Sequence, residues 1–266
     1  MLENILSAPC IAVAGLGKEG CTTIYWLRRK GYHGKIIAAD LREKELPEGV
    51  DEACFGNNYL ENISKIPIIF RTPGIPLEKF LKAGCQLNAI TSQSAIILAN
   101  CSVIGVTGTK GKSTVSSLIA HILRKAKIRC HLSGNIGTPF FELPDEAWNE
   151  VIVAEFSSHQ LLDVRHSPHI AVLLEIVPEH LDYYHSFESY VQAKMNILLH
   201  QNTNDILVAS SAYKHGLQAI VKEKGKIITF GQSGNEDFVV NGSEVIYSGK
   251  TVINSCFLRG SHNAIN

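Results

Sequence analysis

The chain has 266 residues, of which 45% are hydrophobic and 19% are charged, and its formal net charge is zero. This length is enough for two domains of ordinary size, and the composition is typical of a globular protein. The balanced charge argues against nucleic acid as a partner, and no apolar run approaches the roughly 20 residues of a membrane span. The seven cysteines include no Cys-x-x-Cys pair, so we expect free thiols and a cytoplasmic location.

The chain begins with a strand, helix and strand around a glycine-rich loop. A predicted strand from Cys10 runs into Gly15-Leu16-Gly17-Lys18-Glu19-Gly20, a helix is predicted from about Cys21 to Lys30, and the next strand ends at Asp40. Such a G-x-G-x-x-G loop, with an acidic residue about 20 positions further on, brings backbone N–H groups and a helix N-terminus to a pyrophosphate. By itself it fits either NAD(P) or a UDP-sugar.

A further strand is predicted over residues 66–71, and the rigid turn Thr72-Pro73-Gly74 follows it. Ligands of open α/β sheets bind at the carboxyl ends of the strands, so this turn is a candidate part of the same ligand site. A plain proline turn would have the same composition. Short helices are predicted over residues 77–83 and 92–98, and we expect the first domain to end at about residue 98.

The second half is organised around a candidate phosphate loop. An apolar strand over residues 102–106 runs into Thr107-Gly108-Thr109-Lys110-Gly111-Lys112-Ser113-Thr114 and then into an amphipathic helix. Backbone N–H groups and the helix dipole bind phosphate at such a turn, Lys112 would neutralise the β- and γ-phosphates, and the Ser113 hydroxyl suits Mg²⁺. The usual P-loop has glycine where Val106 stands, so this is a shorter form of the motif.

This second loop closely resembles the ATP loop of the Mur ligase superfamily, whose members form amide bonds on peptidoglycan precursors through an acyl phosphate. The loop at residues 15–20, the stretch 40–42 and the turn at 72–74 are similar to the UDP-binding parts of the D-glutamate-adding branch, the MurD family. The resemblance implies a Rossmann-like UDP-binding domain over residues 1–98. It implies a P-loop ATPase-like central domain over residues 99–266, with a mainly parallel sheet and a small antiparallel extension.

The resemblance also implies two sets of ligand-binding residues. Those expected to bind the UDP substrate are Gly15, Gly17, Lys18, Gly20, Asp40, Leu41, Arg42, Thr72, Pro73, Gly74, Asn135, Ser157 and Gln160. Those expected to bind ATP are Gly108, Thr109, Lys110, Gly111, Lys112, Ser113, Thr114, Asn263 and Asn266. The family usually has Ser where Glu19 stands. Because a carboxylate facing a pyrophosphate is unfavourable, we expect Glu19 to point outward or the site to bind its ligand somewhat differently.

Candidate metal ligands lie beyond the phosphate loop. The strand over residues 150–155 ends at Glu155, whose carboxylate would be a hard oxygen ligand for Mg²⁺ or would cap a helix beginning near Ser157. Tyr190, Lys194 and Ile197 are spaced to share one helix face, and a lysine on an inward face is unusual unless it is partnered or modified.

By resemblance, Lys194 is carbamylated and His180 helps to hold a second Mg²⁺. The implied catalytic residues are Lys112, His180 and Lys194, and the implied ligands of the two metal sites are Ser113, Glu155, His180 and Lys194. The segment around His180 departs from the family at three positions: Glu175 stands for Asn, Glu179 for Asp and Tyr183 for Arg. Glu179 keeps the negative charge of Asp, whereas Glu175 adds one, which would alter the local metal geometry.

The remaining chain is predicted to form a strand over 205–209, a helix over 211–221, a strand over 226–230 and short antiparallel strands up to about residue 253. It ends at 260–266, which resembles the start of a helix near the adenine of ATP. Mur ligases have a third domain that binds the incoming amino acid. We therefore expect this chain to be an N-terminal fragment with little or no activity alone.

Taken together, the resemblance implies a monomeric, ATP- and Mg²⁺-dependent ligase that adds D-glutamate to UDP-N-acetylmuramoyl-L-alanine. One open alternative is a superfamily ligase that adds another amino acid. Another, of a different class, is a dinucleotide-binding oxidoreductase or redox-sensing module that uses the loop at 15–20. That alternative gives no joint explanation for the second loop, Glu155, His180 and Lys194.

Overall fold

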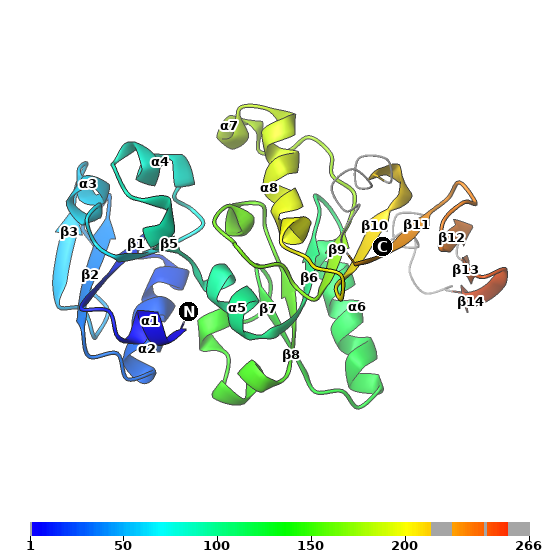
Figure 1. Cartoon of the computed structure of the whole chain (residues 1–266), viewed down its shortest axis with the longest axis horizontal. Helices are drawn as coiled ribbons and strands as arrows, with labels where there is room; N and C mark the ends of the chain where they lie inside the picture. Colours follow the sequence, from blue (N-terminus) through cyan, green and yellow to red (C-terminus); the bar gives the residue numbers. More distant parts are fainter. Residues whose placement is uncertain (1, 214–224, 242–243, 255–266) are drawn as a thin grey trace.

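The computed structural model describes residues 2–213, 225–241 and 244–254 (Figure 1). This part of the chain contains two β-sheets. We call residues 2–100, which contain the first sheet, the first unit. We call the residues from 102 onward, which contain the second sheet, the second unit. None of the described helices is long and apolar enough to cross a membrane.

The first unit is a parallel five-stranded sheet in the order β3-β2-β1-β4-β5. The strands are β1 (Cys10–Ala14), β2 (Lys35–Asp40), β3 (Glu52–Phe55), β4 (Ile68–Arg71) and β5 (Ile90–Thr91). Its helices are α1 (Leu2–Leu6), α2 (Lys18–Arg29), α3 (Tyr59–Ile63), α4 (Leu77–Lys82) and α5 (Gln93–Asn100). Strand β1 is apolar along its whole length, and β2 is apolar between Lys35 and Asp40, because both faces of a parallel sheet are covered.

The described residues of the second unit form a nine-stranded sheet in the order β14-β13-β12-β11-β10-β9-β6-β8-β7. Its parallel strands are β6 (Ser102–Thr107), β7 (Cys130–Gly134), β8 (Val151–Glu155), β9 (Ile170–Leu173), β10 (Ile206–Ser210), β11 (Lys226–Gly231) and β12 (Phe238–Asn241). Two antiparallel strands extend it, β13 (Glu244–Tyr247) and β14 (Lys250–Asn254). The α-helices in its described part are α6 (Lys112–Lys125), α7 (Leu181–Tyr184) and α8 (Phe187–Leu199). The predicted fold class is confirmed.

Several predicted boundaries are wrong. Helix α2 begins at Lys18, directly after the glycine loop, and not at Cys21. Strand β4 begins at Ile68 and not at residue 66. Of the helix expected over residues 211–221, the structure describes a 3₁₀ turn at Ser211–Tyr213. The rest of that prediction lies outside the described residues.

The two units pack against each other through an aromatic stack. The ring of Trp26, on α2, stacks on Phe141 of the second unit at a centroid distance of 3.9 Å, and Trp148 stacks on Trp26 at 5.6 Å. The Gln93 side-chain amide lies beside this stack, donating to Thr22 Oγ1 at 2.8 Å. Aromatic pairs of this kind combine large buried area with fixed ring geometry, so they hold the two units in one relative placement.

Helix α5, which leads from the first unit to the second, has a serine N-cap. Ser92 Oγ accepts a hydrogen bond from the Ala95 backbone N–H at 3.2 Å, and the residue is 2% exposed. We expect Ser92→Ala to lower the free energy of unfolding by about 1 kcal/mol, measured by urea denaturation. Ser102→Ala, at an exposed position at the start of β6, is the control. Equal stability of the two variants would contradict a capping role for Ser92.

Candidate functional site

The phosphate loop connects β6 to α6, and its geometry leaves backbone N–H groups free. Gly111 is the N-cap residue of α6, has a φ of 82° that favours glycine, and provides no side-chain cap. The first N–H groups of the helix therefore have no intrahelical partner and remain available to an anion. Lys112 Nζ donates to the Thr109 carbonyl at 2.9 Å within the same loop. Burial lowers the pKa of Lys112, and the nearby carboxylates of Glu155 and Glu179 partly oppose that shift.

Glu155 lies beside this loop because β8 is the neighbour of β6 in the sheet. Its side chain is held by two polar groups: Ser113 Oγ donates to Oε2 at 2.6 Å, and Asn135 Nδ2 donates to Oε1 at 2.7 Å. A hydroxyl and a carboxylate oxygen so close together are the hard donors that Mg²⁺ accepts, with phosphate oxygens or water completing its coordination. Ser113 and Glu155 therefore fit one magnesium ion.

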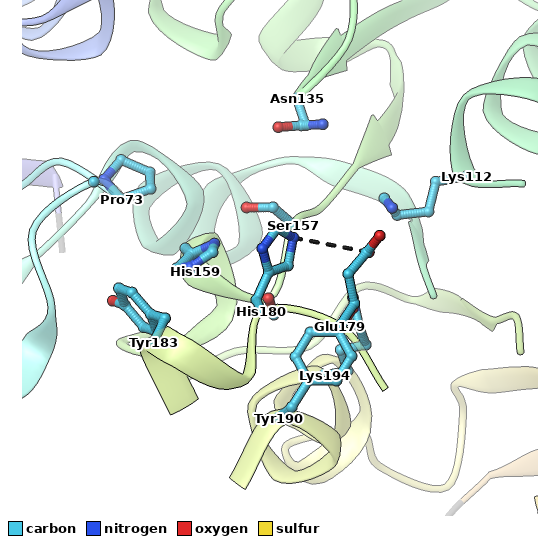
Figure 2. Close-up of a pocket in the computed structure, with 12 residues that line it drawn as sticks. Pro73, Lys112, Asn135, Ser157, His159, Glu179, His180, Tyr183, Tyr190 and Lys194 are labelled. Atoms are coloured by element: carbon cyan, nitrogen blue, oxygen red, sulfur yellow. Dashed lines mark ion pairs between the residues drawn. The ribbon is translucent and has the colours of Figure 1, made fainter. Parts of the chain in front are cut away.

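The described residues include no group of three His, Cys, Asp or Glu side chains placed to hold a metal ion. A second magnesium site, expected at His180 and Lys194, would therefore need a further ligand. His180 has a positive φ of 54°, and its Nε2 lies 3.8 Å from Glu179 Oε2. It is a residue of the same cavity as Lys194 (Figure 2).

Lys194 is 2% exposed, which agrees with the inward helix face predicted for it. Its Nζ donates to the Gly108 carbonyl at 2.7 Å and lies 4.7 Å from the centre of the Tyr190 ring. Burial, with the positive charge of Lys112 as the next cause, lowers the pKa of Lys194 to about 7. A large fraction of this amine is therefore neutral, and hence nucleophilic, near neutral pH.

One cavity, of about 410 Å³, joins the two units. Its wall contains Lys112, Asn135, Ser157, His180 and Lys194 of the second unit, together with the Pro73-Gly74 turn of the first. Figure 2 shows Pro73 on one side of this cavity and Lys112 and Glu179 on the other. A ligand held by the first unit can thus reach the phosphate loop within one continuous space.

The predicted UDP-binding residues of the first unit gather at the carboxyl ends of β1, β2 and β4, which are neighbours in the sheet. Gly15 has a φ of 92°, and a Cβ atom there would lie 2.0 Å from Thr72 Oγ1, so the approach of the two loops requires glycine. Asp40 Oδ2 accepts hydrogen bonds from the Leu16 backbone N–H at 2.8 Å and from Lys44 Nζ at 2.8 Å.

The Asp40 carboxylate is stabilised as an anion. Burial raises its pKa, but hydrogen bonds from Lys44 and from the Leu16 and Arg42 backbones outweigh burial and lower the pKa below its usual value. Leu41 and Arg42 follow it as exposed residues. Helix α2 then begins at Lys18 after the N-cap Gly17, which provides no side-chain cap. This edge of the first sheet therefore combines a second set of free helix N–H groups with a fixed carboxylate.

The expectation that Glu19 points outward is wrong. Glu19 Oε1 accepts a hydrogen bond from Gln160 Nε2 of the second unit at 3.0 Å. Burial raises the pKa of Glu19, and this hydrogen bond partly offsets the increase. Gln160 Oε1 in turn accepts from the Ser157 backbone N–H at 3.0 Å. Ser157 and Gln160, both predicted to bind the UDP substrate, are thereby tied to the glycine loop.

Three residues that the sequence left without a role are linked to one another here: His159 lines the cavity, and Arg71 contacts both His159 and Asp163. Arg71 Nη2 donates to the His159 carbonyl at 2.8 Å and to Asp163 Oδ1 at 2.5 Å. The Arg71 and Asp163 side chains are 0% and 1% exposed, so this is a buried ion pair between the units. Burial, followed by the charges of His180, Arg71 and Lys194, lowers the pKa of His159 to about 4. The motif that carries the resemblance specifies no residue at the position of His159, so it gave no sign of this side chain.

Three residues differ from the family pattern: Glu175, Glu179 and Tyr183. Glu179 pairs with Lys110 at 3.0 Å, and this contact lowers the pKa of Glu179. Glu175 is exposed, and its backbone carbonyl accepts from the Thr109 N–H at 2.8 Å. Tyr183 lines the cavity. The predicted ATP contacts Asn263 and Asn266 lie outside the described residues.

The fold and the site define a two-unit α/β protein in which a glycine loop at a helix N-terminus faces the other unit across one cavity. The family model of the Mur ligase middle domain matches residues 106–266, more than half of the chain. The chain therefore belongs to the Mur ligase family.

Two curated relatives are similar over most of this chain. UDP-N-acetylmuramoylalanine–D-glutamate ligase of Staphylococcus aureus (strain MRSA252) is 32% identical, with 96% of this chain and 60% of that protein aligned. The ligase of the same name from Clostridium kluyveri is 30% identical, with 99% of this chain and 61% of that protein aligned. The chain thus spans about 60% of the length of these relatives.

Among solved structures, UDP-N-acetylmuramate:L-alanyl-gamma-D-glutamyl-meso-diaminopimelate ligase from Neisseria meningitides has a similar fold. Its TM-score is 0.58 at 15% sequence identity, and the alignment covers 97% of this chain and 90% of that one. A murein peptide ligase from Psychrobacter arcticus 273-4 has a TM-score of 0.53 at 16% identity, covering 96% of this chain and 62% of that one.

Proposed function

We propose that this chain supplies the UDP-precursor-binding and ATP-binding parts of a ligase that adds D-glutamate to UDP-N-acetylmuramoyl-L-alanine. Residues 1–98 would hold the UDP moiety, and residues 99–266 would hold ATP. The observation that carries this proposal is the single cavity in which the Pro73-Gly74 turn faces Lys112 and Lys194. The choice of D-glutamate rests on the names of the sequence relatives.

In the proposed reaction, a carboxylate oxygen of the bound precursor attacks the γ-phosphorus of ATP, and ADP leaves. The amine of D-glutamate then attacks the acyl carbon, phosphate leaves, and the amine gives up a proton. Lys112 and the free N–H groups of α6 would stabilise charge on the transferring phosphoryl group. Mg²⁺, held by Ser113 and Glu155, would supply further positive charge at the phosphates.

A calorimetric titration of the chain tests the proposal. We expect binding of UDP-N-acetylmuramoyl-L-alanine and of Mg·ATP, and no binding of NADH. The reverse result, NADH binding without binding of the UDP precursor, would favour a dinucleotide-dependent oxidoreductase or sensor and overturn the ligase proposal.

Carbamylation of Lys194 is part of the proposal, and its pH dependence follows from the lowered pKa. The neutral Nζ attacks CO₂ and loses a proton, which gives an anionic carbamate in place of a cation. The neutral fraction of an amine with a pKa of about 7 rises about tenfold between pH 6 and pH 8. At constant dissolved ¹³CO₂, we expect the ¹³C NMR carbamate signal to increase over this range.

The control for this signal is Lys194→Ala, which should remove it, whereas Lys82→Ala on the exposed surface of α4 should leave it intact. A carbamate signal that survives Lys194→Ala, or one that does not change between pH 6 and pH 8, would contradict the assignment.

A further inference from the structure

The glycine loop of the first unit carries a carboxylate where the proposed function places a diphosphate. Glu19 is the second residue of α2, whose N-cap, Gly17, provides no side-chain cap. The N–H groups that this end of the helix leaves free attract negative charge, whether it belongs to a side chain or to a ligand. The half-buried Glu19 carboxylate is therefore an anion already present at the helix end to which the ligand phosphates are proposed to bind.

Glu19 is held at this position through both its backbone and its side chain. Its backbone carbonyl accepts hydrogen bonds from Thr23 Oγ1 at 2.7 Å and from Gln93 Nε2 at 2.9 Å. Its Oε1 accepts from Gln160 Nε2 of the second unit at 3.0 Å. Gln160 is 2% exposed, and the Ser157 N–H fixes its amide by donating to Oε1. A ligand that binds at the loop therefore meets the Glu19 carboxyl group at a fixed place.

No cation among the described residues forms an ion pair with Glu19. Burial raises the pKa of Glu19 and outweighs its hydrogen bond and the positive charge of Arg71, which lower it. Arg71 is already paired with Asp163, whose negative charge raises the pKa of Glu19 further. Lys18, the preceding residue, is exposed and contacts Glu142 at 4.0 Å. The Glu19 carboxyl group is therefore poorly neutralised and is protonated more easily than an exposed glutamate.

A bound diphosphate ester would bring two further negative charges to the same helix end. Like charges that share a site favour the neutral form of one partner, so the ligand favours protonation of Glu19. A protonated carboxyl group has an O–H donor, and such a donor forms a strong hydrogen bond with a charged phosphate oxygen. We infer that the Glu19 carboxyl group takes up one proton from solvent when the first unit binds a diphosphate ester, and that its O–H donates to a phosphate oxygen. This inference rests on the proposed function.

The inference gives the affinity for the ligand a pH dependence of definite sign. A proton that binds together with the ligand makes the affinity fall as pH rises, by up to about tenfold per pH unit. The fall occurs between the pKa of Glu19 in the free chain and its higher pKa in the complex. Glu19→Gln has nearly the same shape, and its amide donates at every pH. We therefore expect the affinity of this variant, relative to the original chain, to increase about tenfold between pH 6 and pH 8.

The complete chain is titrated by calorimetry with UDP-N-acetylmuramoyl-L-alanine at pH 6 and pH 8 and at constant ionic strength. Both phosphates of this ligand are esterified, so the charge of its diphosphate stays constant over this range. Lys194, with a pKa of about 7, titrates in both proteins, so its contribution cancels in the comparison. Glu3→Gln, exposed on α1, removes the same charge and should keep the pH dependence of the original chain. Titrations in two buffers of different ionisation enthalpy should show greater proton uptake by the original chain than by Glu19→Gln.

The outcomes separate the inference from the proposed function. If the original chain binds the ligand and Glu19→Gln shows the same pH dependence, the inference is overturned while the proposed function stands. A variant that binds more tightly by the same factor at both pH values would also overturn it, because Glu19 would then remain ionised in the complex. If the original chain does not bind the ligand at either pH, the proposed function fails and the inference fails with it.

Discussion

Replacing Lys112 with alanine should weaken binding of Mg·ATP by about 100-fold or more. Lys112 lies at the first position of α6, where the helix N–H groups are free, and its ammonium stays at the loop, where it donates to the Thr109 carbonyl. A hydrogen bond to a charged group contributes up to about 3 kcal/mol, which corresponds to an affinity change of about 100-fold. The affinity is measured by calorimetry at constant ionic strength.

The control for Lys112→Ala is Lys125→Ala, because Lys125 is exposed at the far end of the same helix. It changes the net charge by the same amount and should leave the affinity within about twofold. Similar affinities for the two variants would mean that long-range charge, and not the loop, determines nucleotide binding.

Replacing Arg71 with alanine should lower the free energy of unfolding by about 3 to 5 kcal/mol. The change leaves the Asp163 carboxylate buried without its cation, and it removes the hydrogen bond that the guanidinium donates to the His159 carbonyl. The measurement is urea denaturation followed by circular dichroism.

Two further variants test this explanation. Lys82→Ala breaks the exposed pair with Glu78 and should cause no measurable change, since exposed ion pairs contribute little. The double variant Arg71→Met, Asp163→Leu removes both charges together and should recover part of the loss. If the double variant is less stable than Arg71→Ala, the unpaired carboxylate is not the cause of the destabilisation.

The sequence was informative where a feature depends on residues close together in the chain. The glycine loop, the phosphate loop and their flanking strands could be predicted because turn chemistry and hydrophobic periodicity are local properties. The inward orientation of Lys194 followed from helical spacing to Tyr190 and Ile197, and all three residues are buried.

Contacts between the units could not be predicted in this way. Arg71 and Asp163 are 92 positions apart, and Glu19 and Gln160 are 141 positions apart. No local pattern specifies which residue of one unit will face a given residue of the other. Glu19 was expected to point outward because a carboxylate is unfavourable beside a pyrophosphate, and the sequence did not reveal Gln160 as its partner. His159 was overlooked because its contacts come from two distant segments, one with Arg71 and one with Tyr183 and Tyr184.

The stack of Trp26, Phe141 and Trp148 has a practical consequence. The chain contains two tryptophans, and both are in this stack. Intrinsic fluorescence excited at the red edge of indole absorption therefore originates entirely at the junction of the two units. A ligand that pulls the units apart would hydrate these indoles and shift their emission to longer wavelength. One that closes the cavity without disturbing the junction would leave the spectrum unchanged.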